Sequence, residues 1–282
     1  MIPLAFDYEV AESVDNAVEL LGQHGEDAKL LAGGHSLLPI MKLRLAAPSV
    51  LIDLGRVEEL RYVRDEGDTI AVGAMTRHCD LERNSVLREQ CGLLAFTAGL
   101  VGDPQVRHRG TIGGSIAHGD PASDLPSTLL ALDAELTARG AGGERTIPAG
   151  EFFQDYLQTA LEPGEVLTEI RVPKLGGAGW SYQKFNHRAQ DWATVGVAAV
   201  VEKSDGSIGS ARVALTNMGA TPLRASAVEG ALSGTTLDGI AEAAASADEG
   251  TNPASDIAAS AEYRRHLARV LTRRAVEEAL SR

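Results

Sequence analysis

The chain has 282 residues, of which 44% are hydrophobic and 23% charged, and its formal net charge at pH 7 is −13. This length suffices for one large domain or two to three small ones, and the acidic excess disfavours a nucleic-acid partner. Because the chain has neither a secretory signal nor a long apolar run, we predict no transmembrane segment and a cytoplasmic location.

Cysteine and histidine content bears on metal binding. The chain has two cysteines, Cys79 and Cys91, whereas an iron–sulfur cluster usually needs four thiolates. The seven histidines show no HxxxH spacing on an expected helix. We therefore expect no metal site on this chain, and structural or ligand-adjacent roles for the histidines.

Glycines separate the elements expected in the N-terminal part of the chain. Apolar residues at helical spacing predict a helix over 13–23, which Ser13 or Asp15 can cap and Gly25 ends. A buried strand over 28–33, a helix over 36–45 and a strand over 49–55 follow. This order predicts a βαβ unit with Gly33-Gly34 where the strand feeds the helix.

The middle of the chain predicts a mixed subdomain. The first expected elements are a strand over 68–76, a helix over 76–83 that Thr76 caps, and a helix over 85–100. A helix followed by a strand is expected within 126–136, then a hairpin over 135–148 that turns at 140–143, and a strand over 164–173. Between them, turn-forming residues are expected to keep most of 111–126 out of helix and strand.

A linker-like stretch, LGGAGW at 175–180, marks a domain boundary. Beyond it we predict strands over 180–188, 192–203 and 211–218, short helices over 225–233 and 236–247, and a closing helix over 261–280, with a turn at Asp205-Gly206. The closing helix carries an apolar stripe, and its arginines are expected to face solvent or a partner: Arg264, Arg265, Arg269, Arg273 and Arg274.

Two glycine segments attract most interest: AGGHSLLP (32–39) and TIGGSIAHGDPASDLP (111–126). Neither matches a Walker or a Rossmann signature, but glycine lets free backbone amides converge on an anion. Two such clusters of backbone amides could bind a diphosphate from both sides, and the hydroxyls of Ser36, Thr111 and Ser115 would add further donors. Asp120 and Asp124 suit the hydroxyls of a sugar or polyol. The alternative is that both segments are only tight turns.

AGGHSLLPIMKLRL, TIGGSIAHGDPASDLP and EYRRHLARVLTRRA resemble the flavoprotein (medium) subunits of molybdenum hydroxylases, with the nearest similarity to the medium chain of aerobic carbon monoxide dehydrogenases. The resemblance spans essentially the whole chain. It implies an α+β fold, in which a PCMH-type FAD-binding domain (1–177, with subdomains of about 1–55 and 56–177) precedes a C-terminal domain (178–282). The C-terminal domain would hold a three-stranded antiparallel sheet and a three-helix bundle.

The resemblance also implies the FAD contacts. Residues 32–36 and 111–115 would wrap the pyrophosphate, Asp124 would bind ribityl or ribose hydroxyls, and the loop from Gly102 to Arg109 would flank the ligand. Tyr182 and Lys184 would approach the isoalloxazine, although a core tyrosine and a surface lysine are the alternatives. The full expected set is Ala32, Gly33, Gly34, His35, Ser36, Leu37, Thr76, Val101, Gly102, Thr111, Ile112, Gly113, Gly114, Ser115, Ala117, Asp120, Asp124, Tyr182 and Lys184. No catalytic residue is expected, because the chemistry belongs to the flavin.

By the same resemblance, a small subunit carries two [2Fe–2S] clusters and a large subunit the molybdenum cofactor, in a heterohexamer built as a dimer of heterotrimers. Electrons would pass through FAD to an external acceptor such as a quinone, and the partners could bring the complex to the inner face of the membrane. Three alternatives stay open: a subunit of a related hydroxylase acting on a purine or other heterocycle, a self-contained FAD oxidoreductase, and a non-redox module that binds a phosphorylated ligand.

Overall fold

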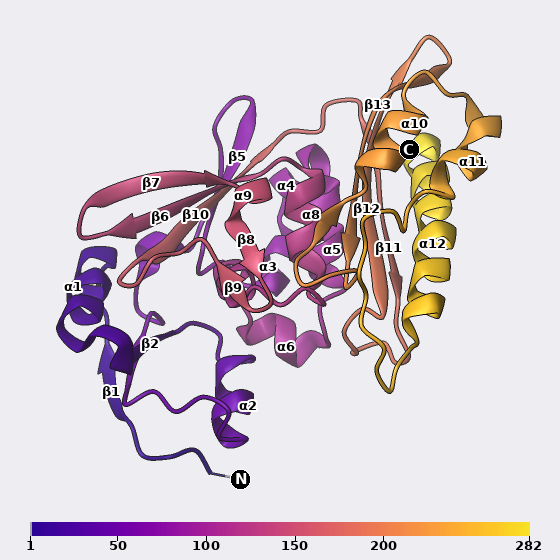
Figure 1. Cartoon of the computed structure of the whole chain (residues 1–282). Coiled ribbons are helices and arrows are strands. Elements are labelled where there is room, and N and C mark those ends of the chain that lie inside the picture. The colour runs from indigo at the N-terminus through magenta and orange to yellow at the C-terminus, as the bar shows by residue number, and fades with distance from the viewer. Residues whose placement is uncertain (1) are drawn as a thin grey trace.

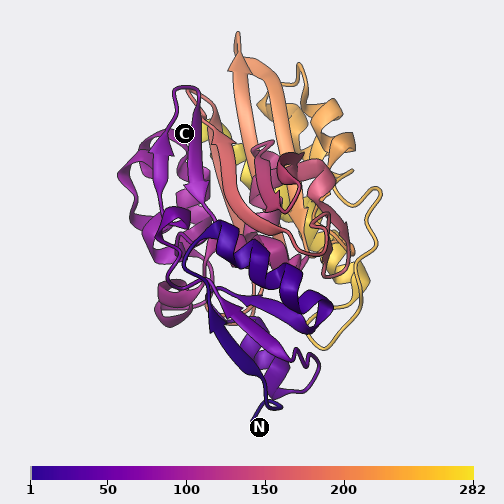
Figure 2. The same ribbon diagram turned by 90° about the vertical axis from the view of Figure 1, so that its left-hand side faces the viewer.

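A computed structural model describes residues 2–282, which fold into three successive parts, each built on one main sheet, with the small two-stranded sheet β8-β9 added in the second part (Figure 1). Residues 2–55 form a small layer at the lower end of the molecule, seen from another side in Figure 2. No helix within residues 2–282 is both long and apolar enough to cross a bilayer.

The first part contains β1 (Asp7–Val10), α1 (Val14–His24), the 3₁₀ turn η1 (Gly25–Asp27), β2 (Ala28–Leu31), α2 (Leu37–Lys42) and β3 (Val50–Asp53). Its sheet has the order β1-β3-β2 with parallel pairs, so the predicted βαβ unit is confirmed and β1 adds an edge strand that the sequence analysis missed. Of the two candidate caps, Ser13 is the one used, accepting from the Asn16 amide. Gly25 ends α1 at φ +57°.

The second part contains η2 (Glu58–Leu60), β4 (Val63–Asp65), β5 (Thr69–Gly73), α3 (His78–Arg83), α4 (Ser85–Gln90), α5 (Gly92–Gly99), α6 (Pro104–Arg109), α7 (Ile112–His118), α8 (Asp124–Ala131), β6 (Glu135–Gly140), β7 (Gly143–Pro148), α9 (Ala149–Phe152), β8 (Phe153–Asp155), β9 (Gln158–Thr159) and β10 (Val166–Pro173). Its five-stranded antiparallel sheet has the order β4-β5-β10-β6-β7, and the predicted hairpin is β6–β7.

The predicted single helix over 85–100 is wrong, because the chain breaks it into α4 and α5 at Cys91. Cys91 adopts φ −145° and ψ 56°, outside the helical region. Beside the break, a Cβ on Gly92 would lie 2.5 Å from Cζ2 of Trp180. The indole of Trp180, which begins the C-terminal domain, therefore occupies the space next to Gly92, and this packing partner is remote in sequence.

The expectation that most of 111–126 stays out of regular structure is also wrong. Residues Ile112–His118 form α7, and α8 begins at Asp124. Thr111 caps α7 by accepting from the Gly114 amide, and Gly119 ends it at φ +66°. The glycine pair lies inside the first turn, where it is needed for close packing: a Cβ on Gly113 would lie 2.5 Å from Cβ of Ala74.

The C-terminal part contains β11 (Gly179–Phe185), β12 (Val195–Ser204), β13 (Ser207–Thr216), β14 (Leu223–Arg224), α10 (Ser226–Leu232), η3 (Leu237–Gly239), α11 (Ile240–Ala244) and α12 (Ala261–Ser281). Three long antiparallel strands and three helices confirm the expected fold, with the two-residue β14 as an added edge. The sheet lies between α8 on one face and α12 on the other (Figure 1).

Both faces of β12 are therefore covered. Ala198 and Val200 belong to the core shared with the second part, whereas Val197 and Ala199 belong to the core beneath the C-terminal helices. A strand buried on both faces needs apolar residues at successive positions, which explains the continuous run in VGVAAVV. The C-terminal domain consequently packs on the rest of the chain through a shared core.

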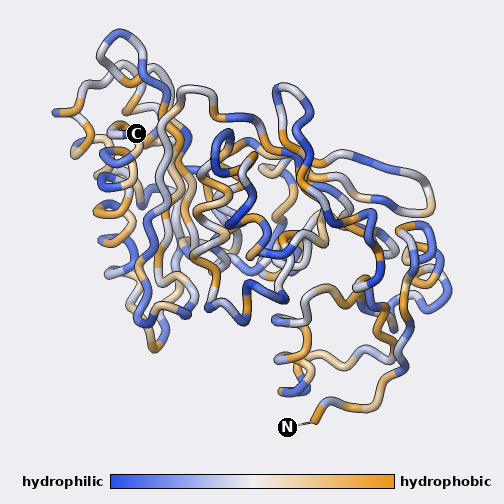
Figure 3. Tube along the Cα trace, turned by 180° about the vertical axis from the view of Figure 1, so that it is seen from behind, coloured by the Kyte–Doolittle hydropathy of each residue, from blue (hydrophilic) through white to orange (hydrophobic). Residues whose placement is uncertain are grey.

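Along α12, buried and exposed positions alternate at helical spacing. Hydrophilic and hydrophobic residues are likewise mixed along this helix (Figure 3). The expectation that Arg264 faces solvent is wrong, because its side chain is 2% exposed. Its guanidinium donates to the carbonyl of Thr194 and, at 2.7 Å, to Oδ2 of Asp256. Sequence periodicity missed this residue because a buried arginine needs hydrogen-bond partners, and one of them, Thr194, lies 70 residues away in the sequence.

Candidate functional site

A cavity of about 1250 Å³ opens where the three parts of the molecule meet. Most of the predicted site residues line it: Ala32, Gly33, Gly34, His35, Ser36, Leu37, Val101, Gly102, Thr111, Gly113, Gly114, Ser115, Ala117, Asp124 and Lys184. The volume slightly exceeds the range of about 300–1,000 Å³ that is typical of small-molecule sites. The cavity therefore has room for a large ligand, on the scale of a dinucleotide.

The two glycine segments touch each other at the wall of this cavity, although about 80 residues separate them in the sequence. A Cβ on Gly33 would lie 2.4 Å from the carbonyl oxygen of Arg109 and 2.7 Å from Cα of Gly110. On the other segment, a Cβ on Gly114 would lie 3.4 Å from Cβ of Ala32. Glycine is thus needed at position 33 because one backbone lies directly against another.

The backbone amides of the two segments differ. Within residues 2–282, no acceptor takes the amides from Gly33 to Leu37, which precede or open α2. By contrast, the amides of the second segment are occupied: Gly113 donates to Ala74, Gly114 to the Thr111 hydroxyl and Ser115 to the Thr111 carbonyl. The prediction of two clusters of free amides is therefore right for the first segment and wrong for the second. The second segment offers the hydroxyls of Thr111 and Ser115 instead.

A buried polar network reaches the cavity from the C-terminal sheet. Nζ of Lys184 donates to Oδ2 of Asp124 at 2.8 Å, and their side chains are 6% and 5% exposed. The hydroxyl of Tyr182 donates to Oδ1 of Asp124 at 2.9 Å and lies 3.0 Å from the Thr216 hydroxyl. Burial raises the pKa of Asp124, while the ammonium of Lys184 opposes this shift. Lys184 is therefore not the surface lysine of the alternative interpretation.

His78 lies behind the contact between the glycine segments. Its amide donates to the carbonyl of Gly110, and a Cβ on Gly110 would lie 2.8 Å from Cδ2 of the imidazole. Burial lowers the pKa of His78 from 6.5 to about 4, and the charges of Arg107 and His35 act in the same direction. The imidazole is thus neutral near pH 7 and lines the cavity without a charge.

Four predicted site residues do not line the cavity: Thr76, Ile112, Asp120 and Tyr182. Thr76 does not cap α3 either, because its hydroxyl donates to the carbonyl of Tyr62. Ile112 is a core residue. Asp120 folds back to accept from the amide of Ala122 at 2.8 Å. Tyr182 lies one hydrogen bond away, behind Asp124.

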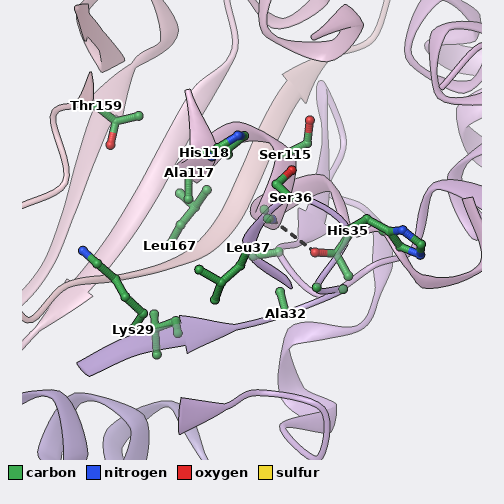
Figure 4. A pocket seen from close by; sticks show the side chains of 18 of the residues that line it. Lys29, Ala32, His35, Ser36, Leu37, Ser115, Ala117, His118, Thr159 and Leu167 are labelled. Carbon is green, nitrogen blue, oxygen red and sulfur yellow. Dashed lines mark hydrogen bonds between the residues drawn. The ribbon is translucent and has the colours of Figure 1, made fainter. Parts of the chain in front are cut away.

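The structure adds lining residues that the sequence analysis did not name. Figure 4 shows Lys29 on β2, Thr159 on β9 and Leu167 on β10 around the space that Leu37 and Ala117 also enter. His78, His118, Gln190, Asp191 and Trp192 also line the cavity. Strand residues such as Lys29 carry no local signal of ligand contact. Among residues 2–282, no three His, Cys, Asp or Glu side chains are grouped to hold a metal ion.

Comparison with known proteins assigns this architecture. Residues 4–175 match the model of the FAD binding domain in molybdopterin dehydrogenase, and residues 180–279 match the CO dehydrogenase flavoprotein C-terminal domain. The chain belongs to the FAD-binding flavoprotein subunits of the molybdenum hydroxylases. The resemblance of the three sequence segments to this family is therefore confirmed.

Relatives in this family match over the full chain. The carbon monoxide dehydrogenase medium chain of Hydrogenophaga pseudoflava is 46% identical over 285 residues, covering 100% of this chain and 99% of the relative. A subunit of the 6-hydroxypseudooxynicotine dehydrogenase complex of Paenarthrobacter nicotinovorans is 40% identical, with 100% and 97% covered. A solved carbon monoxide dehydrogenase structure from Hydrogenophaga pseudoflava superposes with a TM-score of 0.98 at 48% identity, covering 100% and 99%.

The residues around the cavity fit the FAD that this family carries. Unpaired amides from Gly33 to Leu37 suit an anionic diphosphate, and the glycine contact brings both segments to one wall. The buried Asp124 carboxylate suits sugar or ribityl hydroxyls, and the apolar surface of Leu37 and Leu167 suits a ring system. The chain is thus an FAD-dependent oxidoreductase subunit of the molybdenum hydroxylase type.

Proposed function

We propose that the chain is the electron-transfer flavoprotein subunit of an aerobic carbon monoxide dehydrogenase. The observation that carries the proposal is the contact between Gly33 and the Arg109–Gly110 backbone, which joins two remote segments beside a row of free amides. Full-length identity of 46% to a carbon monoxide dehydrogenase medium chain supports the choice of this enzyme within the family.

The proposed contacts follow from the positions of the residues. Amides from Gly33 to Leu37 bind the diphosphate of FAD from one side, and the hydroxyls of Thr111 and Ser115 bind it from the other. Asp124 accepts from ribityl or ribose hydroxyls, while Lys184 lies on the same wall and favours negative charge on a reduced ring. Residues 1–177 form the FAD-binding domain in this proposal, and residues 178–282 form the domain that supplies Tyr182 and Lys184.

When bound, FAD supplies two-electron redox chemistry and can exchange electrons with one-electron carriers. In this proposal the electrons come from [2Fe–2S] clusters of a small partner subunit, which take them from the molybdenum site of a large subunit. Two heterotrimers assemble as a dimer, and a quinone takes the electrons from this chain. The complex is cytoplasmic, and its partners bring it to the inner face of the membrane.

Anaerobic addition of carbon monoxide to the purified complex tests the proposal. We expect bleaching of the flavin and iron–sulfur absorbance and recovery of FAD from this chain after denaturation. A complex without any flavin would refute the flavoprotein assignment. A flavin that carbon monoxide leaves fully oxidised, in a complex with intact clusters and molybdenum, would refute the substrate.

A second candidate is the flavoprotein subunit of a related hydroxylase that acts on a heterocycle. The full-length identity of 40% to a subunit of the 6-hydroxypseudooxynicotine dehydrogenase complex favours it. The substrate is selected on the large subunit in either case, so this chain carries the same electron transfer. Bleaching by a purine or pyridine substrate, and not by carbon monoxide, would identify this candidate.

A further inference from the structure

His78, the first residue of α3, is fixed against the second glycine segment by backbone hydrogen bonds. Its amide donates to the carbonyl of Gly110 at 3.0 Å. Two residues away on each side, the Ile112 amide donates to the carbonyl of Thr76, also at 3.0 Å. The start of α3 is thus anchored to the residues that lead into α7, and His78 is held in one place at the cavity wall.

The side chain of His78 has no partner within the described part of the chain. Its imidazole lines the cavity and is 3% exposed, and it makes no hydrogen bond to any of residues 2–282. Polar side-chain atoms that are buried in folded proteins usually have a hydrogen-bond partner, because leaving them without one costs free energy. A buried imidazole in a cavity wall therefore has bonding capacity left for a ligand.

The tautomer of His78 follows from the position of its two ring nitrogens. Burial keeps the imidazole neutral at pH 7, and a neutral imidazole carries one proton. Nδ1 is fully buried, with no acceptor among residues 2–282. A proton on Nδ1 would leave a buried N–H group unbonded, which is rarer in proteins than an unused acceptor. We therefore assign the proton to Nε2, which makes Nε2 a hydrogen-bond donor.

Nε2 lies beside the contact between the two glycine segments. It is 3.0 Å from the position of a Cβ added to Gly110, and a Cβ added to Gly33 would lie 2.7 Å from Cα of Gly110. Gly110, which has no side chain, thus lies between the imidazole and the first of the free amides. Thr111, the next residue, contributes its hydroxyl to the same wall. A phosphate oxygen at this wall is a strong acceptor for an N–H donor.

We propose that His78 is a further binding residue for the diphosphate of FAD, and that it donates from Nε2 to a phosphate oxygen. This inference rests on the diphosphate position in the proposed function, between the two glycine segments. The contact supplies the partner that the buried imidazole lacks within the chain. Because the imidazole is neutral, it adds a hydrogen bond without burying a further charge.

Substitutions that separate the donor from the bulk of the side chain test the proposal. The complete purified complex is stripped of FAD, and the dissociation constant of FAD is measured from the change in flavin fluorescence on rebinding. His78→Gln keeps an N–H donor at the end of the side chain, whereas His78→Leu fills a similar volume without a donor. We expect the dissociation constant to rise about tenfold in His78→Leu, which corresponds to about 1.4 kcal/mol, and to stay within about threefold in His78→Gln.

His266→Leu, at an exposed position of α12, is the matched control and should leave the dissociation constant within about twofold. His78→Asn has a shorter side chain that ends before the position of Nε2, and it replaces His78→Leu if that variant does not fold. A role in packing alone predicts that leucine retains affinity better than glutamine. That order, or equal dissociation constants in the two variants, overturns the inference and leaves the proposed function intact.

Competition with ADP locates the contact, because ADP carries the diphosphate without the flavin. We expect ADP to displace FAD from the wild-type complex, and its inhibition constant to rise in His78→Leu by the same factor as the dissociation constant of FAD. A loss of affinity for FAD alone, or ADP that does not compete in the wild type, overturns the assignment to the diphosphate. A wild-type complex that contains no flavin as purified refutes the proposed function itself.

Discussion

Nζ of Lys184 lies 2.8 Å from Oδ2 of Asp124, and this buried pair joins the C-terminal strand β11 to the start of α8. Taking two charges out of water costs free energy that their attraction only partly returns. The pair therefore adds little net stability, but each member depends strongly on the other. Substituting one member of the pair, or both, tests that dependence.

Lys184→Met is expected to destabilise the chain by about 3–5 kcal/mol, because it leaves the Asp124 carboxylate buried without its cation. The double variant with Asp124→Asn is expected to lose less, since the amide carries no charge. Urea unfolding of the four proteins in a double-mutant cycle measures the coupling. Additive losses would show that the two side chains act independently.

Gly113→Ala is expected to destabilise the chain by about 1–3 kcal/mol and to lower its FAD content, because the new methyl group would lie 2.5 Å from Cβ of Ala74. Flavin absorbance per chain and urea unfolding measure both effects. Gly22→Ala is the matched control: this glycine is in α1, with nothing within 4 Å of an added Cβ. It should stabilise the helix by about 0.5–1 kcal/mol. Equal flavin content in both variants would argue against the close packing at Gly113.

The stability of the chain is expected to fall on acidification because of His78. Its pKa is about 4 in the folded chain and 6.5 without burial, so the unfolded state binds the proton more readily between these values. Stability is thus complete above pH 6.5 and declines as the pH falls toward 4. From pH 7 to pH 5 the loss from this group is about 2 kcal/mol.

Urea unfolding of the wild type and of His78→Gln at pH 7 and pH 5 isolates this contribution, because glutamine does not titrate. The difference in unfolding free energy between the two proteins should change by about 2 kcal/mol between the two pH values. A difference that does not vary with pH would show that His78 is not the responsible group.

Arg264→Met is expected to destabilise the C-terminal domain by about 2–4 kcal/mol, since the buried guanidinium bonds the Thr194 carbonyl and Asp256. Arg274→Met, at an exposed position of the same helix, should change stability by less than about 0.5 kcal/mol. Thermal unfolding of the two variants compares them directly. Similar melting temperatures would mean that the contacts of Arg264 add no net stability.

Local sequence patterns predicted most elements correctly where the cause is local. The helical spacing over 13–23, the cap at Ser13 and the turn at Asp205-Gly206 all lie within a few residues of the structure they produce. The break at Cys91 and the burial of Arg264 were missed for the opposite reason. Trp180, which packs beside the break, and Thr194, whose carbonyl accepts from Arg264, are both far away in the sequence.

The sequence by itself determined the βαβ unit, the β6–β7 hairpin, the three long strands and closing helix of the C-terminal domain, and the family, because turn residues, hydrophobic periodicity and motifs lie in consecutive residues. Only the tertiary structure decided which amides stay free, that Gly33 lies against Gly110, and that Lys184 pairs with Asp124. These properties depend on distances between segments that chain folding brings together, and no local pattern specifies such distances.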